Sequence, residues 1–349
     1  MERKAYNPFL DVIKFILANM VVCIHFVIPG CLGDAIDCLA RVAVPFFFII
    51  SGYYSYNSES IVLWRRFRRT IIILLGSSIL YCIWGVWKTV GLSGLGISSF
   101  IHDKINCATA IDFLFFSVNP FSNHLWFLHA LAVSYLFLIL VLFAIRKEKA
   151  RCMVLVSLLV ILLCAHIVLG TIIPALSIEP IPKQYYRNAW LFGIPVFLIG
   201  YSIHIWKARR ALAKKPNRLI QFIIVITGLA LGLFQWFRFG HAEMPVGILL
   251  ATVFIFLFAL EQSAKTTDSK SYDKLVKISK ILGASSVWIY LIHKLVGEVI
   301  EAYVPYSDFC KLVYDGALFT ITVMIVSTAI SLIIALGVGF VKKKVLEHT

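Results

Sequence analysis

The sequence predicts an all-α membrane protein, a polytopic bundle of about ten transmembrane helices with both termini on the cytoplasmic side. The first observation is composition: of 349 residues, 60% are hydrophobic and only 15% are charged, and the mean hydropathy is +0.88. A soluble domain is about half apolar and about a quarter charged, so a soluble enzyme and a disordered chain are both excluded. The second observation is that the apolar residues form continuous runs, of the length of membrane helices, rather than the alternating strands of an outer-membrane barrel.

Ten runs are close to the roughly 20 residues that a helix needs to cross about 30 Å of hydrocarbon. The predicted spans are 9–30, 41–57, 70–90, 124–145, 152–172, 187–206, 219–237, 244–261, 281–303 and 316–341. An even number of spans places both termini on the same side of the membrane. The segment 91–123 contains a weakly amphipathic stretch, 97–117, which we expect to lie at the external interface. We expect residues 1–349 to form a single integral-membrane domain with no soluble domain.

The third observation is the distribution of the basic residues, which also explains the net charge of +15. Of the 33 Lys and Arg residues, 24 lie in alternate segments between the spans, at the two termini and in the loops that follow every second span. Cytoplasmic loops of membrane proteins carry this excess, so the charge indicates orientation rather than a nucleic-acid partner. Cys31 and Cys38 share one predicted short loop, and a disulfide between them stays open at this point.

The first span carries three ionisable side chains, Asp11, Lys14 and His25. Such groups are costly inside a membrane and by default indicate a functional site. Lys14 and His25 are 11 residues apart, nearly three helical turns, so they share one face with an axial offset of roughly 16 Å. Asp11 precedes Lys14 by three residues and can be its counter-ion. A snorkelling Asp11–Lys14 pair and a structural hydrogen-bonded His25 are the plain alternatives.

Other ionisable residues stand beside aromatic and small residues. Arg41 precedes an apolar helix that contains Ser51 and Gly52, two small residues that allow close helix contact. His124 and Trp126 fit an interfacial aromatic belt as well as a site. His293 is followed by Lys294, which suggests an interface position. His129, His166 and His204 are expected to be packed polar groups.

Several of these residues fall into an ordered set of motifs. Asp11-x-x-Lys14 and His25 are followed by Arg41-x-x-x-Pro-x-Phe-Phe-x-x-Ser51-Gly52-Tyr53, then Arg65-Arg66-Phe67-Arg68-Arg69, His124-Leu-Trp126-Phe, Pro195-Val-Phe-Leu-Ile-Gly200 and Tyr290-Leu-Ile-His293. The set spans essentially the whole chain and resembles the acyltransferase-3 family of bacterial membrane acyltransferases. The one departure is Lys14, where many members have arginine; the charge is kept, but the bidentate guanidinium is lost.

The resemblance implies a donor, an acceptor and a location. Acyl-CoA, in this family usually acetyl-CoA, would bind from the cytoplasm, and the acyl group would pass to a hydroxyl of an extracytoplasmic or membrane-embedded acceptor such as a cell-surface glycan. The protein would lie in the bacterial cytoplasmic membrane as a multi-pass chain in contact with the lipid bilayer. No metal is expected, because the sequence has no HExxH motif or comparable ligand pair.

The resemblance also implies residue roles. The catalytic set is His25, Lys14 and Arg41, with His25 as general base or as an acyl-histidine nucleophile and Arg41 at the developing oxyanion. The cationic loop of Arg65, Arg66, Arg68 and Arg69, together with Lys14, would bind the coenzyme A phosphates, although the loop can equally serve as a topology signal. Acceptor contacts are expected from Asp11, Ser51, Tyr53, His124, Trp126 and His293.

A second function stays open. The Arg41–Tyr54 run and His124-Leu-Trp126 are most similar to the membrane domain of vancomycin-resistance-type serine racemases, which belongs to the same family and is associated with serine supply. That similarity implies movement of serine or another small solute instead of acyl transfer. A non-catalytic membrane partner is the third reading.

Overall fold

The computed structural model describes residues 6–56, 58–176, 181–209, 217–262, 270–304 and 316–347, and within them it contains helices and no strand. Nine helical stretches of this described part are long and apolar enough to cross a membrane. The eighth predicted span is the shorter helix α12 (Val246–Glu261), 16 residues. The predicted helical membrane bundle is therefore confirmed. Six of the 24 basic residues counted above lie outside the described residues, namely Arg3, Lys4, Arg210, Lys214, Lys215 and Lys265.

The helices group into two compact units. Unit 1 contains α1 (Pro8–His25), α2 (Gly30–Ala40), most of α11 (Arg218–Phe239), α12, α13 (Lys270–Tyr303) and α15 (Ala317–Glu347). Unit 2 contains the chain from α3 (Ala43–Tyr53) to α10 (Ile194–Arg209) and the segment 235–246. Between α3 and α10 it holds α4 (Ser60–Val86), η1 (Trp87–Leu92), α5 (Ile97–Lys104), α6 (Cys107–Phe116), η2 (Asn123–Leu125), α7 (Trp126–Ala144), α8 (Glu148–Ile167), η3 (Val168–Ile172), α9 (Ile173–Ala175), η4 (Lys183–Tyr185) and η5 (Ala189–Gly193).

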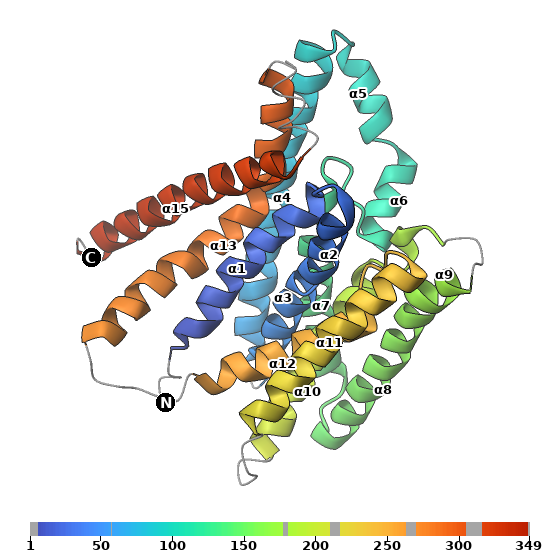
Figure 1. The fold of residues 1–349 in the computed structure, drawn as a ribbon, viewed down its shortest axis with the longest axis vertical. Helices are drawn as coiled ribbons and strands as arrows, with labels where there is room; N and C mark the ends of the chain where they lie inside the picture. Colours follow the sequence, from blue (N-terminus) through green and yellow to red (C-terminus); the bar gives the residue numbers. More distant parts are fainter. Residues whose placement is uncertain are drawn as a thin grey trace. The chain divides into compact units, whose positions relative to one another are not determined.

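Unit 1 is built on two parallel helices, α1 and α13, which lie side by side with α15 (Figure 1). Gly283 of α13 faces Asp11 near the start of α1, and Gly297 faces Phe26 at its end. Residue numbers rise together along the two helices, so α1 and α13 run in the same direction. A Cβ atom on either glycine would overlap the facing side chain. The two glycines therefore permit the close approach of the helices.

Helix α15 packs against both α1 and α13. Thr320 donates to the carbonyl oxygen of Phe26 over 2.8 Å, and Thr328 donates to the side-chain oxygen of Asn19 over 2.6 Å. Its numbers rise as those of α1 fall, so α15 is antiparallel to α1. This direction agrees with the predicted order, in which the first and ninth spans run one way and the tenth runs back.

Unit 2 is held by close helix packing and an aromatic core. Gly52 of α3 and Gly200 of α10 face one another's backbones, and a Cβ atom on either would overlap a carbonyl oxygen of the other helix. The prediction that Gly52 permits close contact is confirmed. Beside this crossing, the ring of Phe48 packs edge-on against Phe127, with ring centroids 4.8 Å apart, and also contacts Phe192.

The segment predicted to lie at the external interface forms two short helices, α5 and α6. Phe100 of α5 is buried and lies in the space left by Gly85 of α4. Helix α6 ends at Ser117, whose positive φ of 62° turns the chain out of the helix. The Ser117 hydroxyl is fully buried, bonds with Nδ1 of His129 and accepts from the Ala189 N–H. Both ends of the two-helix segment are thus tied to unit 2.

We predict that Gly200→Ala destabilises the protein by about 1–3 kcal/mol, because the new methyl group must push two backbones apart. Ala has a higher helix propensity than Gly, which by itself would stabilise the variant. The clash must therefore cost more than this gain for the stability of Gly200→Ala to fall. Gly76→Ala in α4 is the matched control, since a Cβ there meets open space. Denaturation in detergent should show a lower midpoint for Gly200→Ala and an unchanged or higher one for Gly76→Ala. Equal midpoints would contradict the packing of α3 on α10.

Candidate active site

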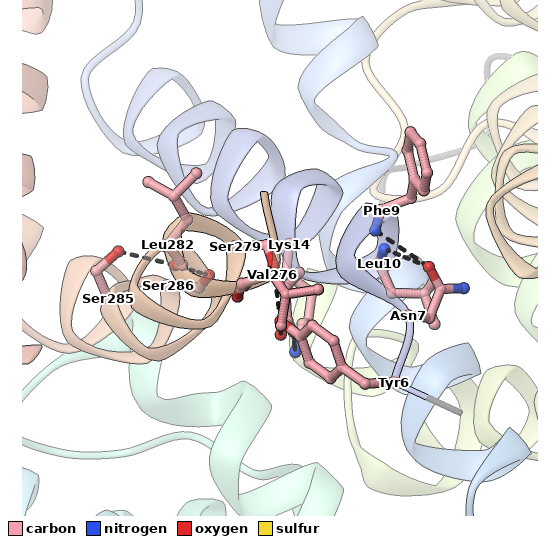
Figure 2. Close-up of polar contacts among 11 residues, drawn as sticks. Tyr6, Asn7, Phe9, Leu10, Lys14, Val276, Ser279, Leu282, Ser285 and Ser286 are labelled. Carbon is pink, nitrogen blue, oxygen red and sulfur yellow. Dashed lines mark hydrogen bonds and ion pairs between the residues drawn. The ribbon is translucent and has the colours of Figure 1, made fainter. Parts of the chain in front are cut away.

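The charged residues of α1 form a compact cluster with the start of α13. Lys14 forms an ion pair with Asp11, as predicted from their spacing. The Tyr6 hydroxyl donates to the second carboxylate oxygen of Asp11 over 2.5 Å and lies 2.9 Å from the hydroxyl of Ser279 in α13. Figure 2 shows Tyr6, Lys14 and Ser279 converging between the two helices. Both carboxylate oxygens of Asp11 therefore have a partner.

The surroundings of Tyr6 keep it a hydrogen-bond donor. Burial and its hydrogen bond to Asp11 raise the pKa of the Tyr6 hydroxyl above its ordinary value, so it stays protonated at neutral pH. The ammonium of Lys280 lies over the Tyr6 ring, 5.1 Å from the centroid, in a cation–π contact. Gly283 leaves the space that the Asp11 carboxylate occupies. The cluster fastens the beginning of α1 to α13.

Two histidines meet further along the same helix pair. The rings of His25 and His293 have centroids 5.1 Å apart. His293 is fully buried, and its Nδ1 lies 3.0 Å from the Ile289 carbonyl oxygen and 2.9 Å from that of Tyr290. Carbonyl oxygens only accept, so Nδ1 carries a proton and Nε2 is the basic nitrogen of the neutral ring. The suggestion that His293 lies at an interface is wrong, because its side chain is inside unit 1.

The end of α1 is fixed around His25. Phe26 follows it and places its ring where Gly297 has no side chain, 5.4 Å from the Phe319 ring centroid in an edge-on contact. The backbone of Phe26 also accepts the hydrogen bond from Thr320. The residue next to His25 therefore contacts both α13 and α15.

Arg41 lies in unit 1 and is held by a partner that the sequence reasoning missed. Its Nε and one Nη donate to the two oxygens of Asp37 over 3.1 and 3.2 Å. The spacing of this bidentate pair fits the helix α2 that the preceding residues form, whereas 31–40 were predicted to form a loop. Asp37 precedes Arg41 by four residues, and that spacing was the available signal.

The helix α2 also settles the question of the nearby cysteines. Cys31 and Cys38 are free thiols on this helix. They are seven residues apart, about 10 Å along the axis, beyond the Cα separation that a disulfide allows. The second membrane stretch accordingly runs from Gly30 to Tyr53 and not from 41 to 57.

The four arginines predicted in a cytoplasmic loop lie instead within α4, which begins at Ser60. The loop prediction is wrong because the helix begins ten residues before the apolar run that was predicted to span 70–90. Arg66 turns inward and donates to the carbonyl oxygen of Tyr54 over 2.7 Å, with the Ser55 hydroxyl 3.3 Å away. Arg65, Arg68 and Arg69 are exposed. We call these three residues the α4 basic face.

The remaining predicted site residues lie in unit 2 and have packing partners there. His124 is only 1% exposed, bonds to the Ser122 hydroxyl over 2.8 Å and packs edge-on against Tyr81. Trp126 is also buried, under the guanidinium of Arg187 at 5.4 Å. The interfacial-belt alternative is therefore wrong for both residues.

The α3 residues and the other histidines likewise contact protein groups. Ser51 donates to the Phe47 carbonyl oxygen over 2.7 Å. The Tyr53 ring packs against the His204 ring with centroids 4.4 Å apart and planes tilted by 33°, and the Tyr53 carbonyl oxygen accepts a hydrogen bond from His204 Nδ1. The prediction that His129, His166 and His204 are packed polar groups is confirmed, as each bonds to a serine hydroxyl or a carbonyl oxygen.

The predicted residues thus fall into two sets. Unit 1 brings together the α1 residues Asp11, Lys14 and His25 with His293, and it also contains Arg41. Unit 2 contains Ser51, Tyr53, Arg65, Arg66, Arg68, Arg69, His124 and Trp126. The residues missed in unit 1 are Tyr6, Asp37, Ser279 and Lys280. Of these, Tyr6 and Ser279 are 273 residues apart in sequence and offered no local signal.

We predict a measurable coupling between Asp11 and Lys14. In a double-mutant cycle of Asp11→Asn and Lys14→Met, the double variant should be more stable than the sum of the single effects by about 1 kcal/mol, a value reduced for the 27% exposure of Lys14. The same cycle on the exposed pair of Asp103 and Lys104 is the matched control and should show no measurable coupling. Additive effects at both pairs, measured by denaturant titration in detergent, would contradict a structural role for the Asp11–Lys14 pair.

Comparison with known protein families identifies the family to which the chain belongs. The family model of acyltransferase family 3 matches residues 7–336 of the 349-residue chain. This model is described as an acyltransferase domain. The match runs through both units. No curated protein and no solved structure matched the chain. Because the match covers nearly the whole chain, the protein belongs to acyltransferase family 3 and is a multi-pass membrane acyltransferase.

Proposed function

We propose that this enzyme transfers an acyl group, acetyl foremost, from cytoplasmic acyl-CoA to a hydroxyl of an extracytoplasmic or membrane-embedded acceptor such as a cell-surface glycan. The membrane would be the bacterial cytoplasmic membrane. The observation that carries the proposal is the pair of His25 and His293, with ring centroids 5.1 Å apart at one end of the α1–α13 interface. An imidazole in this position can act as the general base that attack by a hydroxyl requires.

In the proposed reaction His25 accepts the proton of the acceptor hydroxyl. The hydroxyl oxygen attacks the thioester carbonyl carbon, and the carbonyl oxygen becomes an oxyanion. When the tetrahedral intermediate collapses, the bond from carbon to sulfur breaks. His25 then returns its proton to the leaving thiolate, so the products are the ester and free coenzyme A. His25 therefore ends each cycle in the state in which it began.

His293 supports this role through its fixed tautomer. Its Nδ1 proton is directed at the carbonyl oxygens of Ile289 and Tyr290, so the ring keeps a basic Nε2. We assign His293 to positioning His25 and to accommodating the charge that His25 gains when it takes the proton. This assignment replaces the expected contact of His293 with the acceptor.

Arg41 is the proposed stabiliser of the oxyanion or of a polar acceptor group. Two N–H groups of its guanidinium donate to the two carboxylate oxygens of Asp37 in a planar, bidentate pair. Such a pair fixes the orientation of the guanidinium before the substrate arrives, which is how preorganised electrostatic stabilisation works. Helix α2, which presents Arg41, packs against α1 within unit 1.

The phosphates of the donor need cations that are not already neutralised. Lys14 is paired with Asp11 and Arg66 donates to the end of α3, so we assign the phosphates to Arg65, Arg68 and Arg69. Guanidinium groups are suited to phosphate because they donate two parallel hydrogen bonds. Lys14 remains in the proposal as part of the Asp11 cluster that fixes the start of α1.

We predict that His25→Gln lowers the rate of acyl transfer by about 10²–10⁴-fold, the usual contribution of a general base. The variant should insert and fold normally, since glutamine is a polar residue of similar length. His102→Gln on the exposed side of α5 is the matched control and should retain full activity. The measurement is release of free coenzyme A from acetyl-CoA by the purified enzyme with membrane extract as the source of acceptor.

Two outcomes would count against the proposal. Full activity of His25→Gln would remove His25 as the base. If the wild-type protein neither uses nor binds any acyl-CoA, the donor assignment fails, and uptake of serine into vesicles containing the protein tests the alternative of small-solute movement.

A further inference from the structure

Three segments of unit 2 that are far apart in sequence meet at the side chain of Arg187. One of its Nη atoms donates to the side-chain oxygen of Asn123 over 3.2 Å, and the other donates to a carboxylate oxygen of Glu243 over 3.4 Å. The guanidinium lies over the ring of Trp126, 5.4 Å from the centroid, in a cation–π contact. Asn123 precedes α7, Arg187 precedes α10 and Glu243 follows α11. By the predicted orientation, all three positions are on the external side of the membrane.

The segments that carry Arg187 and Glu243 are fixed by hydrogen bonds of their own. Asn188, which follows Arg187, is buried, and its side chain donates to two carbonyl oxygens before it and accepts from two N–H groups after it. The side chain of Gln235 accepts from the Val246 N–H over 3.0 Å and so closes the segment that contains Glu243. A ligand that binds here therefore does not have to order these segments first.

The contact between Arg187 and Glu243 differs from the structural ion pair of unit 1. Arg41 bonds with two nitrogens to both carboxylate oxygens of Asp37, at 3.1 and 3.2 Å. Arg187 contacts one oxygen of Glu243, at the longer distance of 3.4 Å. The Nε atom of Arg187 is buried and has no hydrogen-bond partner among the described residues. A buried N–H group without an acceptor costs free energy unless a bound ligand supplies one.

The residue types select a ligand that both donates and accepts hydrogen bonds. The N–H groups of Arg187 only donate, and the carboxylate of Glu243 only accepts. A hydroxyl group does both, and two hydroxyls on adjacent carbons of a sugar ring can bond to the two side chains together. A phosphate or a carboxylate would suit Arg187 but would be repelled by the charge of Glu243. The pair therefore favours a neutral sugar over an anion.

We infer that Arg187 and Glu243, with Asn123 beside them, form a subsite that binds adjacent hydroxyls of one sugar unit of the acceptor. The inference rests on the proposed function, because it takes a glycan as the acceptor. A glycan contains several sugar units, so this subsite need not hold the hydroxyl that is acylated. Its role is to select the acceptor, since a site built to bond a hydroxyl discriminates strongly against a ligand that lacks one.

The test measures binding of envelope glycans from the source organism, labelled at their reducing ends, to the full-length protein in nanodiscs by fluorescence polarisation. The wild type should bind saturably, and pretreatment of the glycans with periodate, which cleaves the bond between carbons that carry adjacent hydroxyls, should abolish binding. Arg187→Lys should weaken binding about ten-fold, because lysine keeps the charge beside Glu243 but loses the paired N–H groups. Glu243→Gln should also weaken binding of a sugar, whereas it would strengthen binding of an anion.

Lys183→Gln is the matched control, because it removes an exposed positive charge from the same segment, and it should leave the affinity unchanged. The inference is overturned if the wild type does not bind the glycans, or if periodate-treated glycans bind equally well. It is also overturned if Glu243→Gln binds more tightly, or if Arg187→Lys and Glu243→Gln lower the melting temperature but not the affinity, as a purely structural pair would. Binding of acetyl-CoA to the same nanodiscs reports separately on the proposed function, whose donor assignment survives each of these results.

Discussion

The parallel packing of α1 on α13 is the constraint on which the rest of unit 1 depends. Gly283 and Gly297 let the two helices approach at both ends, one beside Asp11 and the other beside Phe26. This contact aligns the two ends of α1 with partners about 270 residues away in sequence: Tyr6 with Ser279 and Asp11 with Gly283 at one end, and His25 with His293 at the other. Because Phe26 is held by α13 and α15 together, the histidine pair occupies a fixed place. A general base needs that fixity more than it needs any particular fold.

Charge inside a membrane protein is expensive, and unit 1 handles it by local pairing. Asp11 with Lys14 and Asp37 with Arg41 are both pairs one helical turn apart, so each charge has its partner before the helices assemble. The pairing has a functional consequence, because a Lys14 that is paired with Asp11 binds a polyanion weakly. The α4 basic face of unit 2 is exposed, and our proposals assign it the recognition of the donor, leaving the proton transfer to His25.

Sequence reasoning predicted the helical membrane fold, the Asp11–Lys14 pair and the close contact at Gly52, because each depends on local spacing or composition. It failed where polar residues belong to helices. Residues 31–40 were predicted as a loop, although they belong to α2 and Asp37 pairs with Arg41. The four arginines were also predicted as a loop, although they lie in the first turns of α4. The contacts of Tyr6 with Ser279 and of His25 with His293 join distant segments, so no periodicity in one segment predicts them. Burial of His124 and Trp126 was missed for the same reason.

The central claim is that the enzyme recognises acyl-CoA with one set of residues and performs proton transfer with another. Equilibrium binding of radiolabelled acetyl-CoA to the purified protein in nanodiscs tests it most directly, with the wild type compared to His25→Ala. We predict saturable binding with the same Kd for both proteins, because His25 acts on the acceptor proton and not on the donor. Absence of acetyl-CoA binding by the wild type, or loss of binding in His25→Ala with the fold intact, would contradict the account.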